Sequence, residues 1–276
     1  MNGKIQLYVF YHGFFGHDLS WHLGIHNPAT AKNRTPAAEW YTAPSYTYAI
    51  KHPKAGWIVF DTGNHRDNTT GRIPEEMELF PWEVRPEEHY LASLARVGLS
   101  PEAADVLVLS HLHNDHAGNL DLFAGTKAGR QVIVQQAELA HALLVTHKGK
   151  ERYVDSYNRD DFAGIPGIAF TTVQGDVEIA DGVELIHLPG HSPGSQGMIV
   201  HMEDTGTVIL TADAVYQWRN FGPPPIPPGI MDSKREWLQS IDKLRVLQLR
   251  HQANLFFGHD WDQYTKELVI APEHYE

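Results

Sequence analysis

The 276 residues are 42% hydrophobic and 20% charged, and they include no cysteine, which excludes disulfides, thiolate metal ligands and cysteine nucleophiles. The 22 Lys and Arg residues against 34 Asp and Glu residues give a net charge of −12, which argues against a broad electrostatic surface for nucleic acid. Histidine is abundant, at 18 residues. No segment approaches the about 18 to 20 consecutive apolar residues that a membrane span requires.

The N-terminal segment, Met1 to Phe15, has one lysine and a short apolar run that His12 interrupts. Because no small-residue cleavage site follows this run, it is typical of a first strand and not of a secretory signal. We therefore expect a cytoplasmic protein without a membrane partner.

Runs rich in Val, Ile and aromatic residues predict strands along the whole chain, and most of them stop at Gly, Asp, Asn or His. The nine runs are Ile5–Phe10, Tyr46–Lys51, Trp57–Asp61, Asp105–Ser110, Gln131–Val134, Val183–Leu188, Met198–Met202, Thr207–Thr211 and Asn254–Phe257.

Helical patterns lie between these predicted strands. Pro86–Val97 starts with a proline and two glutamates, and apolar spacing after the capping-box residue Ser233 predicts a long helix that ends near His251. This alternation predicts an α/β architecture.

The most informative segment is Ser110-His-Leu-His-Asn-Asp-His116, at the end of a predicted strand. Side chains two residues apart in an extended chain point the same way, so His111 and His113 can bind one cation together. Asp115 and His116 follow where the chain would turn into a helix, which directs them toward a second position. Since unpaired buried imidazoles and a buried carboxylate destabilise a fold by several kcal/mol, this arrangement indicates a metal site.

Three later strand ends supply further residues of ligand type, namely His191, Asp213 and His259. The carboxyl ends of strands are where α/β folds build their sites, so we expect these residues to complete a seven-residue set. A separate N-terminal group of histidines lacks carboxylates at fixed spacing and is not assigned to the metal site. Its members are His12, His17, His22 and His26.

Taken in order along the chain, this set resembles the metallo-β-lactamase superfamily, and the resemblance covers nearly the whole chain. It is carried by Phe60-Asp-Thr-Gly63, the His-x-His-x-Asp-His motif, Gly190-His191, Ala212-Asp213 and Gly258-His259. The resemblance implies an αβ/βα sandwich of two mixed sheets flanked by helices, built as one domain (residues 1–276) from two half-units.

The same resemblance implies two divalent metal ions. His111, His113 and His191 would hold the first ion. The second would be held by Asp115, His116 and His259, and Asp213 would bridge both. Zinc is the first candidate, with iron, cobalt and manganese as alternatives, because mixed nitrogen and oxygen ligands do not discriminate sharply among these metals.

Within the superfamily, the chain is most similar to the N-acyl homoserine lactonases. Those enzymes have a tyrosine three residues after the bridging Asp, and Asp213-Ala-Val-Tyr216 matches that pattern. Three segments, His26–Thr30, Phe80–Trp82 and Gly222–Ile230, are similar to one subgroup of these lactonases, which is dimeric. By that resemblance the acyl chain would be bound by Trp21, Leu79, Phe80 and Ile230, for which ordinary packing is the alternative interpretation.

The resemblance implies hydrolytic opening of the lactone ring of N-acyl homoserine lactones, and so degradation of a quorum-sensing signal. A hydroxide bridging the metals would attack the carbonyl carbon, since metal binding lowers the pKa of water to about 7. Tyr216 would stabilise the oxyanion, and Asp115 would help to protonate the leaving alkoxide. Three alternatives stay open: a dinuclear hydrolase of this fold acting on other lactones, thioesters or phosphotriesters, a redox di-iron protein, and a metal-binding module without turnover.

Overall fold

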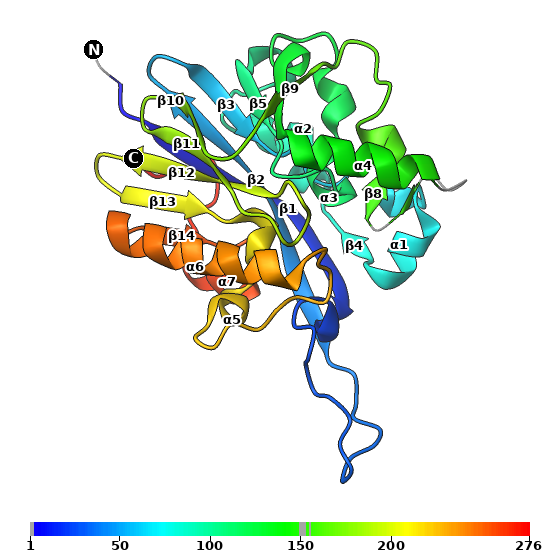
Figure 1. The fold of residues 1–276 in the computed structure, drawn as a ribbon. Helices are drawn as coiled ribbons and strands as arrows, with labels where there is room; N and C mark the ends of the chain where they lie inside the picture. The colour runs from blue at the N-terminus through cyan, green and yellow to red at the C-terminus, as the bar shows by residue number, and fades with distance from the viewer. Residues whose placement is uncertain (1–2, 149–152, 155) are drawn as a thin grey trace.

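The computed structural model of the chain describes residues 3–148, 153–154 and 156–276. Two mixed β-sheets lie face to face, with helices on their outer sides (Figure 1). In spatial order the seven-stranded sheet contains β4 (Trp82–Glu83), β1 (Gln6–Asp18), β2 (Trp40–His52), β3 (Gly56–Phe60), β5 (Val106–Val108), β6 (Val132–Gln135) and β9 (Phe170–Val173). The five-stranded sheet contains β10 (Val177–Ala180), β11 (Val183–His187), β12 (Gln196–Met202), β13 (Gly206–Leu210) and β14 (Asn254–Phe256). A separate hairpin pairs β7 (Tyr153–Val154) with β8 (Tyr157–Asn158).

The α-helices are α1 (Pro74–Leu79), α2 (Tyr90–Ala95), α3 (Asn114–Ala117), α4 (Gln136–Lys148), α5 (Trp218–Phe221), α6 (Lys234–His251) and α7 (Trp261–Lys266). α2 and α4 lie beside the seven-stranded sheet, and α6 runs along the five-stranded sheet (Figure 1). None of the helices in the described ranges is both long and apolar enough to cross a bilayer.

Three apolar layers follow from the alternation of side chains along the strands, which sends successive residues to opposite faces of a sheet. Leu7, Ile58 and Val108 of the larger sheet meet Leu185 and Val208 of the smaller one in the central layer. The outer layers bury helix faces. In the layer over the smaller sheet, the apolar stripe of α6 is fully or almost fully buried; it consists of Trp237, Ile241, Leu244 and Leu247. The predicted arrangement of two mixed sheets flanked by helices is therefore confirmed.

All nine predicted strands are present, and α6 begins where its sequence pattern indicates, with the Ser233 side chain accepting a hydrogen bond from the N–H of Glu236. The prediction of one helix over Pro86–Val97 is wrong in its first turn. Pro86–Glu88 is a 3-10 turn, and His89 is extended (φ −56°, ψ 146°) before α2 starts. The carbonyl of Glu88 accepts from the ring Nδ1 of His12 at 2.9 Å, so a tertiary contact replaces helical bonding there.

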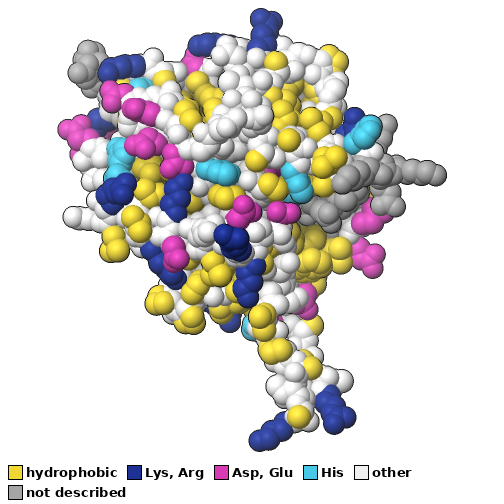
Figure 2. Space-filling model, viewed as in Figure 1, with side chains coloured by type: hydrophobic (Ala, Val, Ile, Leu, Met, Phe, Trp, Pro, Cys, Tyr) yellow, Lys and Arg dark blue, Asp and Glu magenta, His cyan; other side chains and the backbone are white. Residues whose placement is uncertain are grey.

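The chain between β1 and β2 leaves the body as an arm (Figure 1), and Lys and Arg side chains lie at its end (Figure 2). The base of this arm is tied to the proline-rich loop before α6. Gly24 donates its N–H to the carbonyl of Pro227, and Gly229 donates its N–H to the carbonyl of Trp21, both at 2.9 Å. These two bonds hold Trp21 next to the loop that carries Ile230.

Candidate metal centre

The seven ligand-type residues all follow the carboxyl ends of strands. His111 and His113 come after β5, and Asp115 and His116 lie in the short helix α3 that begins immediately afterwards. The other three residues follow β11, β13 and β14, and they are His191, Asp213 and His259. Since β3 and β5 are parallel, as are β13 and β14, their carboxyl ends bring these loops to one edge of the sandwich.

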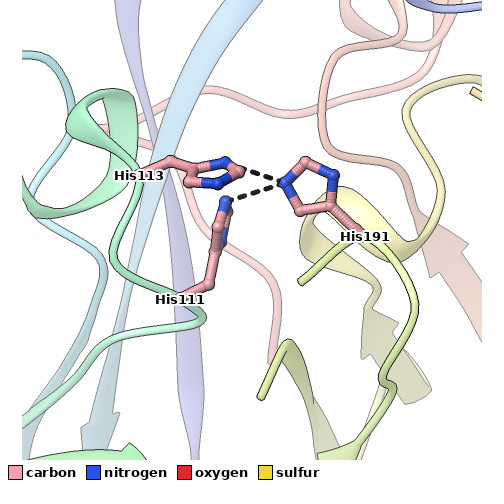
Figure 3. A group of neighbouring side chains, drawn as sticks. All are labelled: His111, His113 and His191. Carbon is pink, nitrogen blue, oxygen red and sulfur yellow. Dashed lines mark hydrogen bonds between the residues drawn. The ribbon is translucent and has the colours of Figure 1, made fainter. Parts of the chain in front are cut away.

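The first group consists of His111, His113 and His191, and their rings point toward one another (Figure 3). The Nε2 atom of His191 lies 3.1 Å from Nε2 of His111 and 3.0 Å from Nδ1 of His113. All three side chains are buried. Three buried imidazole nitrogens that converge on one point are a typical donor set for a divalent transition metal.

The second group consists of Asp115, His116, Asp213 and His259, whose candidate ligand atoms lie within 4.8 Å of one another. Asp213 joins the two groups. Its Oδ1 lies 3.1 Å from Nε2 of both His116 and His259, and its Oδ2 lies 3.4 Å from Nε2 of His191. The two oxygens of one carboxylate therefore face two different sets of ligands, as a bridging carboxylate requires.

Two buried atoms of this centre fit a cation better than any protein partner. Nε2 of His116 and Oδ1 of Asp213 have no hydrogen-bond partner with acceptable geometry among the residues that the structure describes. Leaving such groups unpaired in a protein interior destabilises the fold. Nitrogen and carboxylate donors at these positions fit two neighbouring divalent ions, and this donor set contains the seven residues predicted from the sequence.

The histidines of the two groups differ in the direction of their pKa shifts. Burial, together with the neighbouring imidazoles, lowers the pKa of His111 and His113 well below the ordinary value, so both rings are neutral. Burial also acts to lower the pKa of His116, but the carboxylates of Asp213 and Asp115 outweigh it and raise that pKa. Burial opposes ionisation of Asp213, yet the nearby imidazoles of His116 and His259 hold its pKa well below the usual range. Metal binds neutral imidazole and ionised carboxylate, so an ion at the second group would displace the proton that the raised pKa keeps on His116.

A second layer of side chains orients the candidate ligands. Asp61 accepts the backbone N–H of Ser110 at 2.6 Å, the Ser110 hydroxyl at 2.7 Å and the ring Nδ1–H of His116 at 2.9 Å. The buried Glu138 accepts the N–H of Leu112 at 2.9 Å and the hydroxyl of Ser192 at 2.6 Å, so it ties both ligand loops to α4. Such outer partners fix the tautomer and direction of a metal-binding imidazole.

Tyr216 lies beside this centre, fully buried. Its hydroxyl oxygen is 3.2 Å from Nδ1 of His191, and its ring stacks on His22 with the centroids 4.4 Å apart. Burial and the carboxylates of Asp213 and Asp115 raise its pKa well above the ordinary value, so the phenol keeps its proton.

A pocket opens over the metal centre. Trp21, Phe80 and Ile230 line it together with Asp115 and Tyr216, whereas Leu79 lines an adjoining hollow that shares Trp21, Phe80 and Ile230 with this pocket. The four residues predicted for the acyl chain are thus brought together, although only two of them, Leu79 and Phe80, are close in sequence.

Sequence reasoning missed the other polar residues that line the same pocket, namely His22, Asn64, Glu76, Asn114 and Ser156. His22 belongs to the N-terminal histidine group, and its ring lies 5.8 Å from that of His259 without joining either ligand group. A lone histidine in a loop gives no sequence signal for this packing. Glu76 gave no signal because the helix α1 that holds it was not predicted. Asn114 occupies a position of the His-x-His-x-Asp-His motif to which the sequence analysis assigned no role.

Comparison with known proteins gives a consistent result. The model of the metallo-beta-lactamase superfamily matches residues 40–259. An N-acyl homoserine lactonase of Bacillus cereus is 32% identical over 236 residues, which cover 84% of this chain and 86% of that protein.

Solved structures agree with these sequence matches. A variant of the lactonase AiiA of B. thuringiensis, with N-decanoyl-L-homoserine bound at its active site, is 27% identical and superimposes with a TM-score of 0.80 over 98% of both chains. An N-acyl homoserine lactone hydrolase with its product, N-hexanoyl-L-homoserine, bound at the catalytic metal centre has the same identity, coverage and TM-score.

Proposed function

The chain belongs to the metallo-beta-lactamase superfamily and, within it, to the N-acyl homoserine lactonases, and from this premise we propose that it hydrolyses the lactone ring of N-acyl homoserine lactones. One observation carries the proposal: the Asp213 carboxylate faces two groups of ligands at the base of a pocket that also contains Tyr216 and apolar side chains. Hydrolysis of these lactones degrades a quorum-sensing signal.

The centre would bind two divalent cations, with zinc as the first candidate and iron, cobalt or manganese as alternatives. His111, His113 and His191 would hold one ion, while Asp115, His116 and His259 would hold the other and Asp213 would contact both. Bound metal would lower the pKa of a coordinated water to about 7 and so supply hydroxide at neutral pH.

The residues around the centre would then direct the reaction. The Tyr216 hydroxyl would donate a hydrogen bond to the carbonyl oxygen as it becomes an oxyanion, an interaction worth about 3 to 4 kcal/mol in comparable sites. When the bond between the carbonyl carbon and the ring oxygen breaks, that oxygen leaves as an alkoxide. Asp115, the most exposed of the ligand-type side chains at 20%, would take the proton of the added hydroxyl group and pass it to this alkoxide, so that the products are a carboxylate and an alcohol. Trp21, Phe80 and Ile230 would hold the acyl chain.

Acid release tests the proposal directly. Metal-loaded protein is mixed with N-hexanoyl homoserine lactone in weakly buffered medium, and the ring-opened acid is identified by mass spectrometry. We expect one equivalent of acid per lactone. Full metal occupancy without acid release would refute the assignment, and a parallel panel of other lactones, thioesters and phosphotriesters would then identify a different hydrolase of this fold.

We also propose a homodimer that acts in the cytoplasm and binds neither membrane nor nucleic acid. Two-fold dimers are the commonest oligomers, and apolar side chains at the arm support a subunit contact there, because Ile25 and Trp40 are 65% and 64% exposed. Light scattering after size exclusion should give twice the mass of one chain, and cell fractionation should place the activity in the cytoplasm.

A further inference from the structure

The ring of His22 packs flat against the ring of Tyr216. Their centroids are 4.4 Å apart and their planes differ by 25°, and both side chains are buried and line the pocket over the candidate metal centre. The rings of His191 and His259 also contact Tyr216, each with its centroid 5.5 Å away, but at steep angles of 73° and 56°. Of these three imidazoles, His22 is therefore the one that covers a face of the phenol ring.

The His22 ring acts on its surroundings by packing. Among the residues that the structure describes, its Nδ1 is enclosed and has no hydrogen-bond partner. Burial, together with the nearby imidazoles of His17 and His259, lowers the pKa of His22 well below its ordinary value, so the ring is neutral. His17 packs against the same ring, with the centroids 4.3 Å apart. The position of His22 is thus set by ring contacts and by its backbone.

The backbone of His22 is tied to the segment that directly follows Tyr216. The tie is Asn220 in α5, which is fully buried. Its Nδ2 donates to the carbonyl of His22 and to the carbonyl of Ile226, both at 2.8 Å, and its Oδ1 accepts the N–H of Gln217 at 3.0 Å. Because Gln217 is the residue after Tyr216, one side chain fixes the two backbones whose rings stack on each other.

We propose that His22 is a positioning residue for Tyr216, which keeps the phenol hydroxyl at the metal centre, 3.2 Å from Nδ1 of His191. The proposal rests on the lactonase function proposed above, in which this hydroxyl stabilises the oxyanion. Such a donor must be in place before the reaction, because a displacement of about 1 Å can lower a rate about 10²-fold. His22 supplies that restraint without touching the reacting atoms.

A double-mutant cycle with N-hexanoyl homoserine lactone tests this role. His22→Leu replaces the flat ring by a branched chain of similar size, and it should lower kcat about 10-fold, the scale of one aromatic pair. KM should change little, since the Tyr216 hydroxyl acts on the transition state. In the Tyr216→Phe background the hydroxyl is already gone, so His22→Leu should lower kcat no further.

Two more variants separate positioning from other effects of the substitution. His22→Phe keeps a flat ring and removes both ring nitrogens, so its kcat should be close to that of the wild type. His251 at the end of α6 contacts the ring of His201 at 5.2 Å, and neither residue lines the pocket. His251→Ala removes that ring contact and should leave kcat unchanged in both backgrounds. Metal content is measured in every variant by elemental analysis.

Each outcome decides for or against the positioning role. An equal loss from His22→Leu in both backgrounds would show that His22 acts independently of Tyr216, and a loss of metal would assign it to the metal site; either result overturns the proposal. A loss in His22→Phe as large as in His22→Leu would mean that a ring nitrogen contacts the substrate, which also overturns it.

Failure of the proposed function gives a different result. If wild-type protein with full metal opens no lactone, the lactonase function fails and the positioning role falls with it. If His22→Leu does not fold, His22→Phe decides alone: activity close to that of the wild type supports the role, and a loss of about 10-fold overturns it.

Discussion

Replacing Asp61 by Asn should weaken metal binding at the second group selectively. In the structure Oδ2 of Asp61 accepts from the Nδ1–H of His116 at 2.9 Å, which leaves Nε2 of His116 facing Asp213 as the ring nitrogen that can give up its proton to a metal. The Asn side chain can still accept the N–H of Ser110 with its oxygen, but an NH₂ group then faces Nδ1 of His116. This arrangement favours the other tautomer, with the proton on Nε2, where it blocks the lone pair needed for a metal.

The Ser110 hydroxyl, which the same Oδ2 accepts, can rotate and accept from the new NH₂ group. The size of the effect therefore follows from the charge-assisted bond to His116, which is worth about 1.5 to 3 kcal/mol. A tenfold change in a binding constant corresponds to about 1.4 kcal/mol, so the affinity of the second group should fall about 10- to 100-fold, the range typical of outer partners of metal ligands. The first group should change less, because Asp61 reaches it only indirectly: it accepts the Ser110 hydroxyl, whose oxygen lies 2.9 Å from Nδ1 of His111.

Zinc-loaded protein dialysed against graded chelator concentrations, followed by elemental analysis, measures both affinities. Asp61→Asn should pass through a plateau with one metal per chain at chelator concentrations where the wild type still holds two. The exposed Asp181, which pairs with Lys54, provides a matched control, and Asp181→Asn should behave as the wild type. Retention of both metals at wild-type affinity, or their simultaneous loss, would refute the tautomer argument.

Three further changes test the site and the fold. Tyr216→Phe should lower kcat by about 10²-fold or less while metal content stays intact, since one oxyanion donor is lost; loss of metal in this variant would make Tyr216 structural. Glu138→Gln should reduce the free energy of unfolding by about 1 to 3 kcal/mol in denaturant titrations, because an NH₂ group cannot accept the bonds that one carboxylate oxygen now accepts; an unchanged midpoint would contradict this. Burial lowers the pKa of His12 from 6.5 to about 4, so the unfolded chain binds more protons in this range. The contribution of His12 to stability should therefore fall by up to about 3 kcal/mol as the pH drops from 6.5 to 4. His12→Gln should flatten that part of the pH dependence, and an equal slope in both proteins would exclude His12 as its source.

The central strands were predictable because they are buried on both faces and read as continuous apolar runs. Among the strands that were missed, β9 and β10 lie at the edges of their sheets, where none of their residues is fully buried and the apolar signal is weak. The helix predicted over Pro86–Val97 started late for a different reason. His12, about 76 residues away in the chain, takes the Glu88 carbonyl, and no local pattern contains that contact.

The candidate ligands were predictable from sequence because each lies in a segment that follows the carboxyl end of a strand. A residue directly after a strand is placed at the carboxyl edge of the sheet whatever the rest of the chain does, and the motif from His111 to His116 contains four such residues. The family resemblance, which rests on the order of these residues along the chain, is confirmed by the family model and by the related lactonase. The roles of the individual residues stay predictions. That residues 1–276 form a single domain also stays a prediction.

The rest of the pocket depends on elements that meet only in the folded chain. Glu76 reaches the centre because α1 packs near α3, and Trp21 faces Ile230 because backbone bonds join the base of the arm to the proline-rich loop. These contacts leave no periodicity or fixed spacing in the sequence. A relative that keeps all seven ligand-type residues but differs at α1 or the arm would therefore retain the metal chemistry and change its substrate. For this reason the ligand set predicts the reaction class, whereas substrate selectivity should depend on the pocket residues that α1 and the base of the arm contribute.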